Sequence, residues 1–233
     1  MTQPLPIVLV PGLLASARLY GEQLPELWRW GPVTIADHTR DDSIPAIARR
    51  ILATAPPRFA LAGLSMGGYV VLEIVRQAPE RVDRLALLDT TARPDTPELT
   101  ERRRRQIELA RAGRLADIID LQFPLIVHPA RLDDERLRAT VELMAHETGV
   151  EAFVRQQTAI IGRADSRPHL AAIACPTLVL VGDADELISP ENSIELADGI
   201  GGARLVTVPE SGHLTTLERP QAVTTALVEW LRG

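Results

Sequence analysis

Six short runs of apolar, largely β-branched residues recur along the chain, separated by turns or by segments with helical periodicity. Within each run the apolar residues are consecutive rather than alternating, which is typical of strands buried between two layers of helices. The runs cover residues 7–10, 33–36, 58–62, 84–88, 177–181 and 204–208. We therefore expect six strands with both faces covered.

Helix start signals lie between several of these runs. Ser43 followed by Pro45 predicts a helix to about residue 55, with Ser43 as its N-cap and the proline in the first turn. Pro190 and Pro220 predict helices toward residues 200 and 231. With a further helix over residues 66–76, strands and helices alternate. The sequence therefore predicts an α/β fold with a doubly wound, mainly parallel sheet of about six strands.

One region breaks this alternation, because residues 94–167 carry helical periodicity and no strand pattern. Helices are predicted over residues 97–112, 115–121, 133–147 and 151–161. The sequence thus predicts an all-helical insertion at residues 94–167, within a core formed by residues 1–93 and 168–233.

Four consecutive arginines, Arg102 to Arg105, fall inside the first of these helices and are expected to interrupt it, with Gly113 ending it. Such a run could form an anion site. Because the chain is net acidic, we interpret it instead as a solvated helix face.

The amino-acid composition and net charge limit the classes of function that this chain can have. The 233 residues are 45% hydrophobic, which fits one globular domain with a sizeable core. A net charge of −6 gives no electrostatic reason to expect nucleic acid or an anionic membrane as a partner. Cys175 is the single cysteine, so an internal disulfide is excluded and a reducing compartment is expected. The N-terminal apolar run is broken by prolines and lacks a basic start, so we expect a cytoplasmic protein without a signal peptide or membrane span.

The clearest chemical motif is GLSMG, which places Ser65 between Gly63 and Gly67. Glycine is needed where another segment comes very close or where φ is positive. The motif stands between a predicted strand and a predicted helix, which is the context of the G-x-S-x-G nucleophile elbow. A glycine-rich helix start with a capping serine, or a phosphate cradle, is the alternative. The strand–turn–helix context favours a nucleophile.

A nucleophilic serine needs a base, and the base needs an acid that orients it. His213 follows the last predicted strand and precedes the last helix, where its side chain can face Ser65. The other histidines lack this position and are interpreted as ordinary surface, loop or core residues: His38, His128, His146 and His169.

Three acids compete for the orienting role. Asp183 and Asp185 both follow the predicted strand at residues 177–181, and Asp89 follows the strand at residues 84–88. Any of the three could reach the histidine, and spacing alone does not separate Asp183 from Asp185.

The segments VLVPGLL, LAGLSMGGYV, RLALLDT, PTLVLVGDADELISP and SGHLTTLERP occur in this order along the chain. Together they resemble the α/β-hydrolase superfamily, in the group of small carboxylesterases, enol-lactone hydrolases and carbon–carbon bond hydrolases with a helical cap. The resemblance implies that the acid is the second aspartate of a G-x-x-D pattern, Asp185 counted from Gly182, and that the base is His213. Asp183 is then expected to bind backbone amides of its own turn.

The resemblance also implies an oxyanion hole made by the backbone amides of Leu13 and Met66. In relatives, the loop that carries the first of these two amides begins with His-Gly, whereas in this chain it begins with Pro11-Gly12. We expect the two N-terminal antiparallel strands of larger relatives to be missing, because residue 7 already begins the strand that is third in them. DHTRDDS stands where relatives often read Asp-x-Pro-Gly-His-Gly. Apolar residues of the cap and of the catalytic loops are predicted to contact substrate: Leu14, Phe123, Leu125, Ile126, Met144, Phe153, Ile188 and Leu214.

The resemblance implies a serine hydrolase that cleaves a small carboxylic ester through an acyl-enzyme, with a lactone or thioester as the next choice. We expect no metal and no cofactor, a small acyl compound as the substrate, and a monomer or homodimer. Carbon–carbon bond hydrolysis, hydroxynitrile cleavage, perhydrolysis and a menaquinone-pathway elimination use the same triad and remain open, because the fold does not fix the reaction. A non-catalytic ligand-binding protein is a further alternative.

Overall fold

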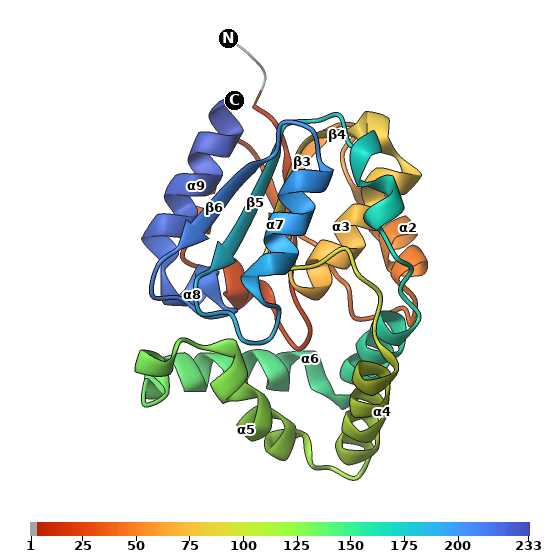
Figure 1. The fold of residues 1–233 in the computed structure, drawn as a ribbon, viewed down its shortest axis with the longest axis vertical. Coiled ribbons are helices and arrows are strands. Elements are labelled where there is room, and N and C mark those ends of the chain that lie inside the picture. Colours follow the sequence, from red (N-terminus) through yellow and green to blue (C-terminus); the bar gives the residue numbers. More distant parts are fainter. Residues whose placement is uncertain (1–3) are drawn as a thin grey trace.

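The computed structural model describes residues 4–233 and contains one six-stranded sheet (Figure 1). All neighbouring strands pair in parallel, in the order β2-β1-β3-β4-β5-β6. The strands are β1 (Ile7–Val10), β2 (Val33–Ile35), β3 (Phe59–Leu64), β4 (Val82–Leu88), β5 (Thr177–Gly182) and β6 (Arg204–Val208). The predicted α/β fold with a parallel sheet is confirmed.

Burial of the strands follows their place in the sheet. Every residue of β1, β3 and β5 is buried, as expected for strands covered on both faces. The two outer strands differ, because β2 is only partly buried and most of β6 is exposed. The expectation that all six strands have both faces covered is therefore wrong at the edges, where Arg204 on β6 instead pairs with Glu229 at 2.6 Å.

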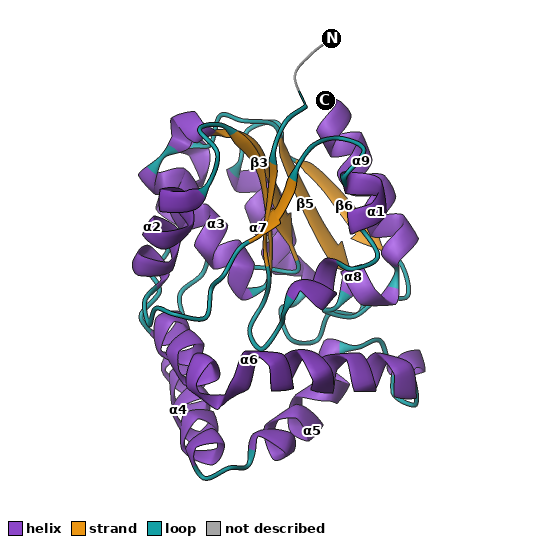
Figure 2. Ribbon diagram, turned by 180° about the vertical axis from the view of Figure 1, so that it is seen from behind, coloured by secondary structure: helices purple, strands orange, loops and turns teal. Residues whose placement is uncertain are grey.

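Helices cover both faces of the sheet (Figure 2). Alternate strand residues point to opposite faces; Val8 and Val10 join one apolar cluster, and Ile7 and Leu9 join the other. The first cluster packs under α2 (Ile44–Thr54), α3 (Met66–Gln77) and α7 (Pro190–Gly199). The second packs under α1 (Leu24–Leu27) and α9 (Pro220–Arg232).

Short helical segments stand between these elements: η1 (Ala17–Tyr20), η2 (Pro79–Arg81), η3 (Pro129–Arg131), η4 (Arg167–Ala172) and α8 (Thr215–Glu218). Ser43 precedes α2 as predicted, but its side chain makes no capping hydrogen bond. None of the helices in residues 4–233 is long and apolar enough to cross a membrane.

Three helices stand between β4 and β5 and extend across the carboxyl ends of the strands (Figure 1). They are α4 (Pro97–Arg111), α5 (Leu115–Ile126) and α6 (Glu135–Ile161), and they pack against one another. We propose that they form a cap over the core, with the boundaries at residues 94 and 167.

The cap helices differ from the sequence-based expectation in three ways. Arg102 to Arg105 do not interrupt α4, because arginine is a good helix former and the run lies within one continuous helix. α5 continues past residue 121 and through Pro124 to Ile126. The two helices predicted at residues 133–147 and 151–161 are both present, but they follow each other directly within α6, with non-helical backbone only at Gly149, where φ is 77° and ψ is 166°.

Candidate active site

Ser65 occupies the sharp turn between β3 and α3. Its backbone has φ 56° and ψ −116°, an unfavourable conformation for a residue with a side chain, and such strain costs about 1–3 kcal/mol. Hydrogen bonds on both sides hold it there. The Ser65 N–H donates to the Leu88 carbonyl at 2.9 Å, and the hydroxyl of Thr90 donates to the Ser65 carbonyl at 2.8 Å.

The glycines of the motif allow this turn to close. A Cβ on Gly63 would collide with the backbone of Gly67, and a Cβ on Gly67 would collide with the carbonyl of Val10 at the end of β1. A Cβ on Gly68 would likewise collide with the side chain of Thr90. The spacing of glycines around Ser65 is therefore explained by close approach of the backbone rather than by positive φ, since none of the three has a positive φ.

The loops after β5 and β6 bring Asp185 and His213 together. Nδ1 of His213 lies 2.8 Å from Oδ2 of Asp185, and both residues are buried. The second carboxylate oxygen of Asp185 accepts hydrogen bonds from the amides of Leu187 and Ile188, at 3.0 and 2.9 Å. These amides fix the carboxylate, so Oδ2 is the oxygen that faces the imidazole.

Electrostatics around His213 favour the protonated imidazole. Burial by itself lowers the pKa of His213, but the charge and hydrogen bond of Asp185, helped by the charges of Asp89 and Glu218, raise it above its ordinary value. An imidazolium formed at this position is therefore stabilised, which is the property required of a base that receives a proton during a reaction.

The other two candidate acids make different contacts. Asp183 accepts a hydrogen bond from the amide of Ser211 at 3.1 Å. The expectation that it binds amides of its own turn is wrong, because its partner lies in the loop that carries His213. Asp89 is fully buried, and its two oxygens accept from the Gly182 amide at 3.0 Å and from the Thr215 hydroxyl at 2.6 Å. Burial and the nearby charge of Asp185 raise its pKa.

A cavity of about 370 Å³ separates the carboxyl ends of the strands from the cap, and both Ser65 and His213 line it. Of the residues predicted to contact substrate, Ile126, Ile188 and Leu214 also line it.

The remaining predicted contact residues lie elsewhere. Leu14, Phe123, Met144 and Phe153 are buried in an apolar cluster, where they pack the cap helices and the first loop against the core. Leu125 is partly buried on α5 and is not part of the cavity wall. The first four are therefore corrected to packing residues, because helical periodicity identifies an apolar face without saying whether it meets a ligand or another helix.

The loop after β1 presents its backbone to the cavity. Leu13 lines the cavity, and Met66 begins α3 directly after Ser65. Within residues 4–233, neither of these two amides donates a hydrogen bond to the protein. Backbone N–H groups at a helix start and in an adjacent loop are suited to stabilise a negative oxygen.

Two residues that hold this loop were missed by the sequence analysis. Nε2 of His38 lies 2.9 Å from the carbonyl oxygen of Gly12, and His38 is buried rather than an ordinary loop residue. The Oε1 atom of Gln156 on α6 accepts from the amide of Leu14 at 3.2 Å. Neither stands in a local motif, so no pattern in the sequence indicates its role.

Charged side chains form a further part of the cavity wall that was not predicted. Four arginines and one glutamate line it: Arg93, Arg102, Arg103, Arg163 and Glu186. The arginine run of α4 was interpreted as a solvated face. That interpretation is wrong for Arg103, which is partly buried, whereas Arg102 lines the cavity and is also exposed to solvent. Arginine at four consecutive positions does not indicate which of them line a cavity. For the part of the chain described, no group of three or more His, Cys, Asp or Glu residues is arranged to hold a metal ion.

Comparison with known proteins places these features in a family. Residues 7–226 match the Alpha/beta hydrolase family. RutD of Klebsiella pneumoniae (strain 342), named as a candidate carbamate hydrolase, is 31% identical over 208 residues, covering 86% of this chain and 76% of its own. A thermophilic esterase from Thermogutta terrifontis is similar in structure, with TM-score 0.88, 30% identity and coverage of 98% and 89% of the two chains. The enol-lactonase of Burkholderia xenovorans LB400 has TM-score 0.90, 25% identity and coverage of 99% and 92%.

Proposed function

The chain belongs to the alpha/beta hydrolase family, and from that premise we propose that it is a serine hydrolase that cleaves a small carboxylic ester through an acyl-enzyme. One observation carries the proposal. A serine in a strained strand-to-helix turn and a histidine paired with a buried aspartate line the same cavity.

In the proposed reaction the Ser65 hydroxyl oxygen attacks the ester carbonyl carbon while His213 takes the hydroxyl proton. The C–O bond then breaks, and the alcohol leaves with the proton that His213 returns. Water attacks the acyl-enzyme with His213 again as the base, which releases the acid and restores Ser65. Asp185 holds the imidazole with Nδ1 toward the carboxylate and stabilises the imidazolium in both halves of the cycle.

The negative oxygen of each tetrahedral intermediate is assigned to the amides of Leu13 and Met66. Both are free of acceptors within the described chain, and Met66 adds the positive end of α3. A fixed donor of this kind contributes roughly 3–4 kcal/mol to lowering the barrier. The steps above need no cofactor.

An ester is the first choice of substrate, because a relative that covers nearly the whole chain at 30% identity is an esterase. The cavity of about 370 Å³ fits a small acyl compound. A carbamate is the second candidate, favoured by the 31% identity to RutD. It reacts through the same steps, with a carbamoyl group on Ser65. A lactone follows from the enol-lactonase comparison, and a thioester needs no change in the proposed steps.

The proposal is tested with a panel of p-nitrophenyl butyrate, a p-nitrophenyl carbamate, a lactone and an acyl thioester, using wild type and Ser65→Ala. We expect hydrolysis of at least one ester, and a loss of about five to six orders of magnitude in Ser65→Ala, because nucleophile and base act as a unit. Ser43→Ala is the matched control, since that side chain makes no capping hydrogen bond. Folded Ser65→Ala that retains more than a few per cent of the activity would refute the mechanism.

A further inference from the structure

The cap side of the cavity carries more positive charge than the protein itself neutralises. Arg103 and Arg163 share a single carboxylate, Asp95, whose side chain is almost fully buried. Nε of Arg103 lies 2.7 Å from one oxygen of Asp95, and Arg163 pairs with the other. Two guanidinium groups facing one carboxylate leave one positive charge in this wall.

Other contacts fix both of these arginines in place. Arg103 also donates to the side chain of Gln157 at 2.9 Å. Arg163 donates to the carbonyl of Arg93 at 2.9 Å and stacks on the ring of Tyr69, 4.4 Å from its centroid. They are therefore built into the wall rather than free to move into solvent.

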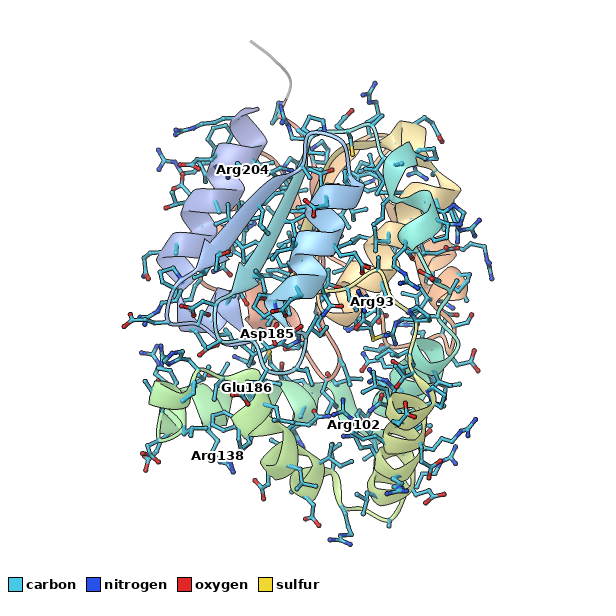
Figure 3. All side chains as sticks on the ribbon, in the orientation of Figure 1. Arg93, Arg102, Arg138, Asp185, Glu186 and Arg204 are labelled. Atoms are coloured by element: carbon cyan, nitrogen blue, oxygen red, sulfur yellow. The ribbon has the colours of Figure 1, made fainter. Side chains whose placement is uncertain are left out.

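Arg102 is the cavity arginine that lacks an anion. Arg93 is paired with Glu195, at 2.8 and 3.0 Å. The guanidinium of Arg102 makes no ion pair and no hydrogen bond to any group in residues 4–233. Figure 3 shows it on the inner side of α4, toward the space between the cap and the core. Arg102 is exposed, and partial desolvation together with the charge of Arg103 lowers its pKa, against an opposing effect of the Asp95 charge.

We propose that the substrate of this hydrolase carries a carboxylate and that Arg102 binds it. This inference rests on the proposed hydrolytic function and names its substrate class. A guanidinium binds a carboxylate through two parallel N–H···O hydrogen bonds, which gives orientation as well as affinity. Arg102 and the surplus charge of the Arg103, Arg163 and Asp95 cluster make two positive charges, and Glu186 on the same wall offsets one of them, so a single negative charge on the substrate matches what remains. A phosphate dianion fits less well, because Glu186 lines the same cavity and makes no ion pair within the described chain.

Two pairs of probes separate the possible positions of the carboxylate. On the acyl side, mono-p-nitrophenyl glutarate is compared with p-nitrophenyl valerate, which has the same chain length without the charge. On the leaving-group side, 4-carboxyphenyl butyrate is compared with phenyl butyrate. Each is measured as kcat/KM with wild type, Arg102→Met, Arg102→Lys and Arg104→Met. Arg104 is the matched control, because it is an exposed arginine on α4 outside the cavity wall.

We expect wild type to prefer the charged member of at least one pair. Arg102→Met should lower kcat/KM for that ester by about 10- to 100-fold, the range of a hydrogen bond to a charged group, and leave its neutral partner unchanged within a few-fold. Arg102→Lys should retain part of the preference, and Arg104→Met all of it.

The inference is overturned if the kcat/KM of wild type for each neutral ester equals or exceeds its kcat/KM for the charged partner. The proposed function would still stand in that case. The same holds if Arg102→Met affects charged and neutral esters equally. Absence of Ser65-dependent hydrolysis of all four probes would overturn the proposed function itself.

Discussion

Several residues with strained backbone conformations lie beyond the carboxyl ends of the strands. Among residues 4–233, four residues with side chains have positive φ: Leu14 (56°), Ser65 (56°), Asp89 (45°) and Glu210 (54°). Each lies in a loop that follows a strand, after β1, β3, β4 and β6 respectively. Such conformations persist only where the surroundings enforce them. The packed core beneath these loops therefore holds the backbone around the cavity in one geometry.

At the same scale, the environment of His213 predicts how activity depends on pH. Its imidazole must be neutral to accept the serine proton, and its pKa is raised above the ordinary value of about 6.5. Because a raised pKa keeps the ring protonated to higher pH, activity should fall as pH decreases, with its midpoint above that ordinary value. We expect this from kcat/KM for p-nitrophenyl butyrate measured from about pH 5 to 9 at constant ionic strength. A midpoint below the ordinary histidine value would contradict the contacts assigned to His213.

Individual residues were predictable to different degrees. Ser65 and His213 could be proposed from local sequence, because a turn motif and a position after the last strand are both local properties. The contact of Asp185 with His213 could not be derived from spacing, since three acids follow neighbouring strands. Which of them reaches the imidazole depends on the path of each loop, and only the family resemblance favoured Asp185. Asp89 is directed instead to Gly182 and Thr215.

Among the elements, the loops after β5 and β6 act as one unit. The amide of Asp183 donates to the Val208 carbonyl at 3.0 Å, and the amide of Ala184 donates to the Ser211 carbonyl at 2.9 Å. A Cβ on Gly182 would collide with the backbone of Ser211. The two loops are thus tied backbone to backbone, which sets the position of His213 relative to Asp185.

This arrangement predicts different results for two neighbouring substitutions. In Asp185→Asn, the amides of Leu187 and Ile188 keep the amide oxygen where Oδ1 was, so the side-chain NH₂ must face Nδ1 of His213. The imidazole is then held in the wrong tautomer, and we expect kcat to fall by about four orders of magnitude, by analogy with serine proteases. In Asp183→Asn, an oxygen can still accept from Ser211, so we expect nearly unchanged kcat and at most about 1 kcal/mol of lost stability.

Turnover numbers and thermal melting curves of the two folded variants check this pair of predictions, each variant being the control for the other. The assignment of the acid is wrong if Asp183→Asn is the inactive variant. It is equally wrong if both are active and Asp89→Asn is not.

Elements were predicted well where their signals are local. The bounds of β1 and β6 agree with the apolar runs at both ends, and α7 and α9 begin at the prolines that predicted them. The exposure of β6 was missed because strand order, which places it at the edge, is not encoded in the run itself. The break in α6 at Gly149 falls in the predicted gap between the helices at residues 133–147 and 151–161.

At the scale of the whole molecule, the cavity exists only because the cap lies over the carboxyl ends of the strands. Its wall combines loops of the core with side chains of α4, α5 and α6, such as Arg102, Ile126 and Ile160. Sequence patterns predicted that these helices exist, but they could not predict which face of each helix meets the cavity. Four of the apolar residues named as contacts are packed in the core instead, and two arginines of the run on α4, Arg102 and Arg103, line the cavity.

The central claim of this account is that Ser65 is a nucleophile activated by His213. The most direct test is the intact mass of the protein after reaction with a fluorophosphonate, followed by mapping of the modified peptide. We predict a single adduct on Ser65 in wild type, none in Ser65→Ala, and much slower labelling in His213→Ala. Folded wild type that hydrolyses esters but is labelled at another residue, or not at all, would contradict the account.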